Sequence, residues 1–316
     1  MINRFFKKAS ILLTALSIIY VVFVGYQNWI DLREVVNTEG LLFVILIGSG
    51  LYGLNLFLLP FAWQKVIKII GENLSYALSA KIYGQSQIAK YLPGNLFHYL
   101  GRHLLGRQAG LSNSIIVSSI IIETLLITIT AIFLGSITVY FYGWLDVINF
   151  YRLAVFLVVL GVFCFCLYHI CISHKFKKWL FIQNWFESIN MVFNRRAILP
   201  LVSLIVYYVL FFAVIGLILW LMASHFWRLD IIPLIFVGAY SISWVMGFIT
   251  PGAPGGVGVR EALLIIILSP YMLETYALTL ALVLRVITVL GDILFFNMTF
   301  FIKSRVNSKS LEDNSI

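Results

Sequence analysis

The sequence predicts an all-α polytopic membrane protein, organised as a single integral membrane domain over residues 1–316. Hydrophobic residues make up 61% of the chain and charged residues only 11%, and the mean hydropathy is +0.99. A soluble domain of this length could not bury so much apolar surface. The apolar residues also come in runs of about 20, the length that a helix needs to cross a bilayer. No polar stretch is long enough to form a separate soluble domain.

About eight membrane-embedded segments are expected. Six of them have the character of spans, at about 9–27, 41–63, 114–142, 150–172, 198–223 and 272–302. Two more, at 75–112 and 231–270, are apolar but are interrupted by Pro and Gly. The first span follows a basic start, as a signal peptide would. It lacks a small-residue cleavage pattern, so we expect an uncleaved span.

Basic residues orient the predicted spans. They gather at the N-terminus, at Lys65 and Lys68, in residues 173–197 and in the tail 303–316. Bases in short loops mark the cytoplasmic side, so we expect both termini to be cytoplasmic. The formal net charge of +9 therefore indicates anionic head groups and not nucleic acid as the partner.

The same orientation predicts two inverted repeats, residues 1–142 and 150–302, followed by the cytoplasmic tail 303–316. Residues 75–112 must enter from the cytoplasm and return to it, and 231–270 must do the same from the other face. Each segment is then either a re-entrant hairpin or a pair of full crossings. Inverted repeats with Pro- and Gly-broken helices at matching positions occur in transporters whose site lies near the midplane. Eight ordinary spans without this symmetry are the alternative.

The first break is at Pro93, Gly94 and Asn95, and basic residues follow it at His98, Arg102 and Arg107. Non-helical backbone cannot face lipid, so the break must be buried in protein or face water. The N-terminus of the following helix would present free N–H groups to an anion. Alternatively, this is an interfacial helix whose bases extend to the head groups.

The second break, TPGAPGGVGVRE, repeats the arrangement, since Arg260 follows Pro251 by nine positions, as Arg102 follows Pro93. Its small and ring-constrained residues are Pro251, Gly252, Pro254, Gly255, Gly256 and Gly258. Such a loop could bring backbone amides close to a phosphate, although it has no Gly-Lys-Ser/Thr of a nucleotide-binding loop. A plain turn between spans is the alternative.

Three ionisable residues, Glu123, Arg285 and Asp292, lie deep within apparent spans. Charges at membrane depth are costly and usually face a cavity or each other. Our hypothesis is that they form a buried charge network around the hairpin breaks, together with Arg260 and Glu261. Seven positions separate Arg285 from Asp292, so we expect no direct bond between them. A structural ion pair that only fixes helix packing is the alternative.

The sequence contains no pattern that predicts catalysis, a cofactor or a metal. There is no nucleophile elbow, zinc motif or nucleotide loop. Cys164, Cys166 and Cys171 share one apolar segment, which is typical of small buried hydrophobes. We therefore expect a protein that is not an enzyme and binds no metal or cofactor.

Two stretches carry a family resemblance: AKYLPGNLFHYLGRHLLGRQAG with the following IIIET, and TPGAPGGVGVREALLIIIL. On these residues the chain resembles the lysylphosphatidylglycerol synthase transmembrane-region family of flippase-like membrane proteins. The resemblance implies lipid movement across the bilayer, as in the membrane half of enzymes that aminoacylate phosphatidylglycerol, or a role beside glycan or glycolipid synthesis. The chain ends at Ile316 without an aminoacyl-transferase domain, so we expect no synthase reaction.

The resemblance, together with the basic residues at the two breaks, thus implies flippase-like translocation of an anionic phospholipid or polyprenyl-linked glycolipid across the bacterial inner membrane. The residues expected to bind the head group are Asn95, His98, Arg102, Arg107, Arg260 and Arg285. Two alternatives stay open. One is a non-catalytic membrane subunit or scaffold that docks a glycosyltransferase of cell-envelope synthesis, and the other is a small-solute or ion transporter.

Overall fold

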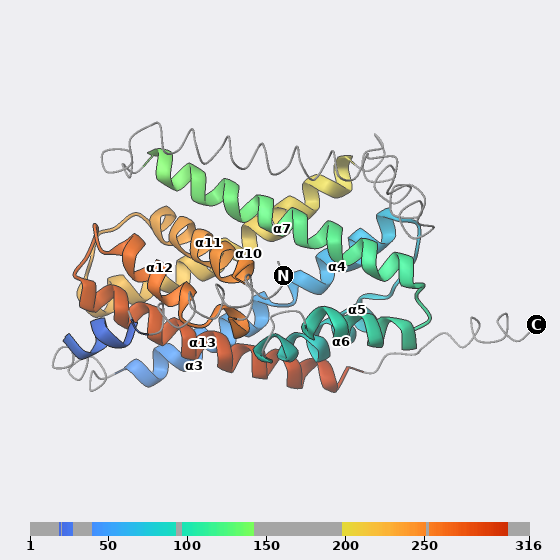
Figure 1. The fold of residues 1–316 in the computed structure, drawn as a ribbon, viewed down its shortest axis with the longest axis horizontal. Helices are drawn as coiled ribbons and strands as arrows, with labels where there is room; N and C mark the ends of the chain where they lie inside the picture. The colour runs from blue at the N-terminus through green and yellow to red at the C-terminus, as the bar shows by residue number, and fades with distance from the viewer. Residues whose placement is uncertain are drawn as a thin grey trace, which may run out of the picture.

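The computed structural model describes residues 19, 21–27, 40–92, 97–141, 198–250 and 253–302, and within these ranges the protein is entirely helical (Figure 1). Four helices are long and apolar enough to cross a membrane: Leu41–Ile69, Asn113–Tyr140, Leu199–Trp227 and Glu274–Phe300. The all-α fold is therefore confirmed. The predicted span 150–172, most of 9–27 and the tail 303–316 lie outside the described residues. The count of eight segments and the inverted repeats remain predictions.

The first long span is broken into α3 (Leu41–Asn55) and α4 (Leu58–Ile69). Pro60 has no N–H, so it cannot complete the helical hydrogen bonding at this point. Side chains from α5 (Tyr76–Gln87) satisfy carbonyls at the break, because the Tyr76 hydroxyl donates to the Phe57 carbonyl at 3.2 Å and Ser79 Oγ donates to the Pro60 carbonyl at 2.8 Å. The break therefore fixes where α5 packs.

The other three long helices are α7 (Asn113–Phe141), α10 (Ile198–Trp227) and α13 (Glu274–Phe300). Helix α13 packs closely along α3 through small residues. A Cβ added at Gly291 would lie only 3.0 Å from the Ser49 carbonyl oxygen and 3.1 Å from the Gly53 nitrogen. Small residues allow helix backbones to approach each other in a membrane, so this contact ties the last helix to the first half of the chain.

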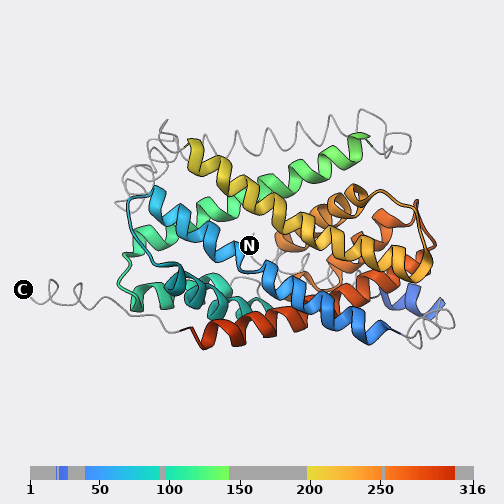
Figure 2. The same ribbon diagram turned by 180° about the vertical axis from the view of Figure 1, so that it is seen from behind.

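Two sets of short helices lie toward opposite ends of the molecule in both views (Figures 1 and 2). One set is α5, the 3₁₀ turn η1 (Ile88–Tyr91) and α6 (Phe97–Gln108). The other is α11 (Pro233–Ile249), the 3₁₀ turn η3 (Pro254–Gly256) and α12 (Val259–Leu268). At 12 residues each, α5 and α6 extend about 18 Å, well short of the roughly 30 Å hydrocarbon core. Their lengths favour a hairpin over two full crossings.

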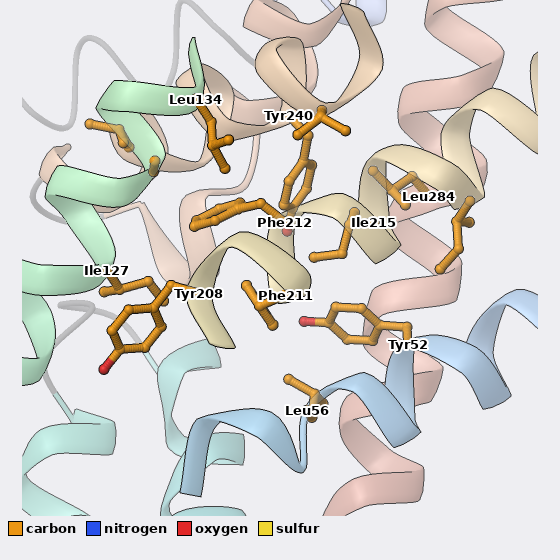
Figure 3. Packing of buried hydrophobic residues seen from close by; sticks show 14 of the residues in the cluster. Tyr52, Leu56, Ile127, Leu134, Tyr208, Phe211, Phe212, Ile215, Tyr240 and Leu284 are labelled. Carbon is orange, nitrogen blue, oxygen red and sulfur yellow. The ribbon is translucent and has the colours of Figure 1, made fainter. Parts of the chain in front are cut away.

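Helix α10 forms the centre of the core (Figure 3). Its buried residues Tyr208, Phe212, Ile215 and Leu219 recur at the spacing of one helical face. Side chains from α3, α7, α11 and α13 surround this face, including Tyr52, Ile127, Leu134, Tyr240 and Leu284. Of the short helices, α11 packs directly on α10, whereas α5 and α6 pack on α4, α7 and α13.

Candidate functional site

The two sets of short helices meet where their 3₁₀ turns come together, since η1 contacts η3. Tyr91 of η1 lies beside Gly255 of η3, where an added Cβ would be 3.3 Å from Tyr91 Cε1. Gly255 has φ of 57°, a left-handed conformation that glycine adopts readily. The break residues Pro93, Gly94, Asn95, Pro251 and Gly252 lie outside the described residues. The turns that flank them nevertheless bring the two sequence motifs together.

The first turn is attached to α13 through Asp292. Lys90 Nζ donates to Asp292 Oδ1 at 2.8 Å and lies 2.7 Å from Oδ2, and the Tyr91 hydroxyl donates to Oδ2 at 2.5 Å. Asp292 is only 1% exposed, so this carboxylate depends on the two donors for its stabilisation. Asp292 was predicted to belong to a buried charge network, but neither of its partners was.

Arg102 of α6 and Glu123 of α7 form a second buried ion pair, in which Arg102 Nη1 donates to Glu123 Oε2. Their exposed fractions are 1% and 3%. The guanidinium lies over the Tyr83 ring, 3.7 Å from its centroid, and 5.3 Å from that of Trp63. Such cation–π contacts stabilise a desolvated arginine. Glu123 thus pairs with Arg102, rather than with Arg260 or Arg285, which our hypothesis assigned to its network.

The second turn is attached to α13 through Arg285. Arg285 Nη1 donates to the Gly255 carbonyl at 3.1 Å and lies 3.5 Å from Glu261 Oε1. The other carboxylate oxygen, Glu261 Oε2, accepts the N–H of Gly258 at 2.6 Å and so caps the start of α12. Among the interactions of the described residues, Arg285 has no hydrogen bond or ion pair with Asp292. This agrees with the expectation that seven positions along one helix are too far for a direct bond.

A cavity of about 70 Å³ lies between these groups. Residues from every described helix and turn between α3 and α12 contribute to its wall. The wall includes the predicted site residues His98, Arg102, Glu123, Gly255 and Arg260, together with Tyr83, Lys90 and Trp244. Glu261 and Arg285 line a neighbouring pocket of about 20 Å³ that shares Arg260. Arg107 lies elsewhere, because it is exposed and donates to the Leu111 carbonyl at 2.9 Å.

Arg260 differs from the other cations of this site because no carboxylate among the described residues pairs with it. Its buried Nε has no hydrogen-bond partner there either. The side chain passes between glycines, since a Cβ at Gly247 would lie 2.5 Å from Arg260 Cγ and one at Gly256 would lie 2.6 Å from its Nε. The two glycines therefore leave the space that brings this guanidinium to the cavity.

His98 provides a second unpaired polar group at the cavity. It is 9% exposed, and its buried Nδ1 has no hydrogen-bond partner among the described residues. Its ring contacts that of Tyr99, with the centroids 3.9 Å apart. Unpaired buried polar groups are rare and call for a ligand or water. The cavity can thus offer an anion a guanidinium and an imidazole.

The described residues contain no group of three His, Cys, Asp or Glu side chains that could hold a metal ion. Four contributors to the site were not predicted from the sequence: Lys90 and Tyr91 as partners of a carboxylate, and Tyr83 and Trp63 as rings around Arg102. Only Lys90 had a feature that could have indicated its role, because it is a lysine in an apolar chain, three positions before Pro93. Tyrosine and tryptophan are common in this sequence, so the two rings carried no signal of their own.

Comparison with known proteins identifies one family. The family model described as "Lysylphosphatidylglycerol synthase TM region" matches residues 9–295, which spans both motifs and all of the site residues above. No curated protein matches the sequence. The resemblance predicted from the two motifs is therefore confirmed over most of the chain.

Proposed function

Because the chain belongs to the lysylphosphatidylglycerol synthase transmembrane-region family, we propose that it moves an anionic phospholipid or polyprenyl-linked glycolipid across the bacterial inner membrane. Membership in this membrane family and four apolar helices long enough to span a bilayer make it an integral membrane protein. We also propose that both termini lie on the cytoplasmic side, because basic residues gather in the loops expected there.

The observation that carries the proposal is the half-buried Arg260 at the cavity, whose buried Nε has no hydrogen-bond partner and whose guanidinium has no carboxylate partner among the described residues. A partly desolvated cation without a counter-charge is unfavourable, and an anion that enters the cavity would supply one. Guanidinium groups bind phosphate through two parallel hydrogen bonds. Arg260, with His98 beside it, is therefore a suitable site for the phosphate of a lipid head group.

The position of the cavity also supports translocation. It lies between two sets of short helices that extend toward opposite ends of the molecule (Figures 1 and 2). In the proposed mechanism each set opens the cavity toward its own side of the membrane, as in transporters built from inverted repeats with a site near the midplane. The small cavity takes the phosphate, while the acyl or prenyl chains stay in the surrounding lipid. The role is non-catalytic, and transport is passive or ion-coupled.

A lipid-movement assay in liposomes tests the proposal. The purified protein is reconstituted with a fluorescent anionic phospholipid, and the fraction accessible to a membrane-impermeant quencher is followed over time. We expect wild-type protein to move the lipid and Arg260→Gln to slow it at least tenfold. Arg107→Gln is the matched control, because it removes the same charge from an exposed position outside the cavity.

The other outcomes separate the alternatives. Wild-type protein that moves no lipid, with Arg260→Gln indistinguishable from it in cells, contradicts the flippase role and favours the scaffold for a glycosyltransferase. Uptake of a water-soluble anion without movement of lipid favours a solute transporter. Equal effects of the two arginine substitutions would show that overall charge, and not the cavity, controls the rate.

A further inference from the structure

The buried charges of the site restrict the charge of its ligand. Four cations, Lys90, Arg102, Arg260 and Arg285, line the cavity or the adjoining pocket. Three buried carboxylates, Glu123, Glu261 and Asp292, accompany them. The remaining described carboxylates, Glu72, Asp230 and Glu274, are all exposed. The six hairpin residues 93–96 and 251–252 carry no charged side chain. Among the described residues the site therefore has one positive charge in excess.

The excess belongs to Arg260 because the other three cations are already matched. Lys90 is paired with Asp292, Arg102 with Glu123, and Arg285 with Glu261 at 3.5 Å. If a ligand recruited Lys90 or Arg102, it would leave a carboxylate that is 1–3% exposed without its partner. Breaking one side of a buried pair is strongly unfavourable. Among the described residues the ligand therefore has Arg260 alone as its free counter-charge.

From this charge balance we infer that the site takes a phosphodiester with a single negative charge, and discriminates against phosphomonoesters and diphosphates. The inference rests on the proposed function and narrows its substrate class. A monoanion neutralises Arg260 and leaves the buried site without net charge. A dianion changes the excess to one negative charge, which a low-dielectric site disfavours. Lipids with a glycerol phosphodiester and prenyl chains joined to sugar through one phosphate share this chemistry.

The room in the cavity agrees with a single phosphate. Its volume of about 70 Å³ is several times the roughly 10–15 Å³ that a cavity measured in this way needs to hold one water molecule. Trp244 and Phe248 stack at 5.4 Å on the wall beside Arg260. They offer apolar surface for the ester substituent and no further positive charge. A second phosphate would therefore lack a counter-ion among the described residues.

The test compares three ligands that differ in charge, two of which have the same acyl tails. Full-length protein in detergent is titrated by calorimetry at pH 8 with dihexanoyl phosphatidylglycerol, dihexanoyl phosphatidic acid and farnesyl diphosphate. Titration of Arg260→Gln corrects for partition into micelles. We expect the diester to bind at least tenfold more tightly than the monoester or the diphosphate. Wild-type protein that binds the diphosphate or the monoester as tightly as the diester overturns the inference.

Two variants change the charge balance at different ion pairs, one at the cavity and one at the adjoining pocket. Glu261→Gln and Glu123→Gln each raise the excess to two positive charges, so we expect each to reduce the preference for the diester at least fivefold. Using two sites keeps the test valid if one variant fails to fold. An unchanged preference in the variants that fold overturns the charge argument.

A soluble probe distinguishes between a lipid and a free phosphodiester as the ligand. Glycerophosphoglycerol carries the same phosphodiester without acyl chains, and we expect it to bind at least tenfold more weakly than the short-chain lipid. Equal binding would support the diester chemistry but contradict a lipid as the substrate. If every anion binds equally well and Arg260→Gln stops lipid movement, the proposed function stands and this inference fails. If no anion binds and lipid movement is absent, both fail.

Discussion

The two turns that meet at the cavity are attached to the same helix in different ways. The first turn, η1, uses side chains, because Lys90 and Tyr91 both donate to the carboxylate of Asp292. The second turn, η3, uses its backbone, because the Gly255 carbonyl accepts from Arg285. Helix α13 thus presents a carboxylate to one turn and a guanidinium to the other.

The difference indicates what each turn can tolerate. Attachment through side chains depends on which residues occupy positions 90 and 91, and it involves a buried charge. Attachment through a carbonyl depends on the path of the backbone, which at Gly255 has a positive φ. We therefore expect changes of charge or hydroxyl to weaken the first turn, and changes of backbone preference to weaken the second.

The largest effect is expected from Asp292→Asn, which removes the counter-charge of Lys90. Lys90 would then be a buried cation without a partner, and breaking one side of a buried ion pair costs about 3–5 kcal/mol. The free energy of unfolding, measured by denaturation in detergent, should fall by about this amount. The double variant Lys90→Met, Asp292→Asn removes both charges and should recover most of the loss. A double variant as unstable as the single one would show that the pair is not what stabilises η1.

A smaller effect is expected from Tyr91→Phe, which keeps the ring against Gly255 and removes the hydroxyl. Its hydrogen bond to the Asp292 carboxylate is 2.5 Å long, and hydrogen bonds to charged groups contribute about 1.5–3 kcal/mol. Tyr76→Phe is the matched control, since the Tyr76 hydroxyl donates at 3.2 Å to the neutral carbonyl of Phe57 and should contribute about 1 kcal/mol. Equal losses of unfolding free energy would contradict a charge-assisted bond at η1.

These pairings show where prediction from the sequence ends. Hydropathy identified all four helices in the described part of the chain that are long enough to span a membrane, and Pro and Gly marked the two short-helix regions. The cost of charge in apolar segments selected Glu123, Arg285 and Asp292. The partner of Asp292 could not be predicted, because Lys90 lies 202 positions away and reaches it only through the packing of α13 against α5 and η1.

Arg102 and Glu123 are only 21 positions apart, yet their pairing was not predicted either. It depends on the angle at which α6 meets α7 and on the rings of Tyr83 and Trp63 around the guanidinium. Periodicity assigns a residue to a face of its own helix, but it does not determine which face of a neighbouring helix it meets. That Arg260 has no carboxylate partner among the described residues is evident only once the partners of Lys90, Arg102 and Arg285 are known.

The smallest of the three effects is expected from Gly255→Ala, which tests the backbone attachment of the second turn. An L-residue in the left-handed region costs about 1–2 kcal/mol, and the added Cβ would also lie 3.3 Å from Tyr91 Cε1 and 3.4 Å from Arg285 Nη2. Gly71→Ala separates these causes, because Gly71 has φ of 95° and no atom within 4 Å of an added Cβ. In both variants the cost of the left-handed conformation should lower the free energy of unfolding. Only Gly255→Ala should slow lipid movement in liposomes. If Gly255→Ala moves lipid as fast as Gly71→Ala, the contact between the two turns is not required for transport.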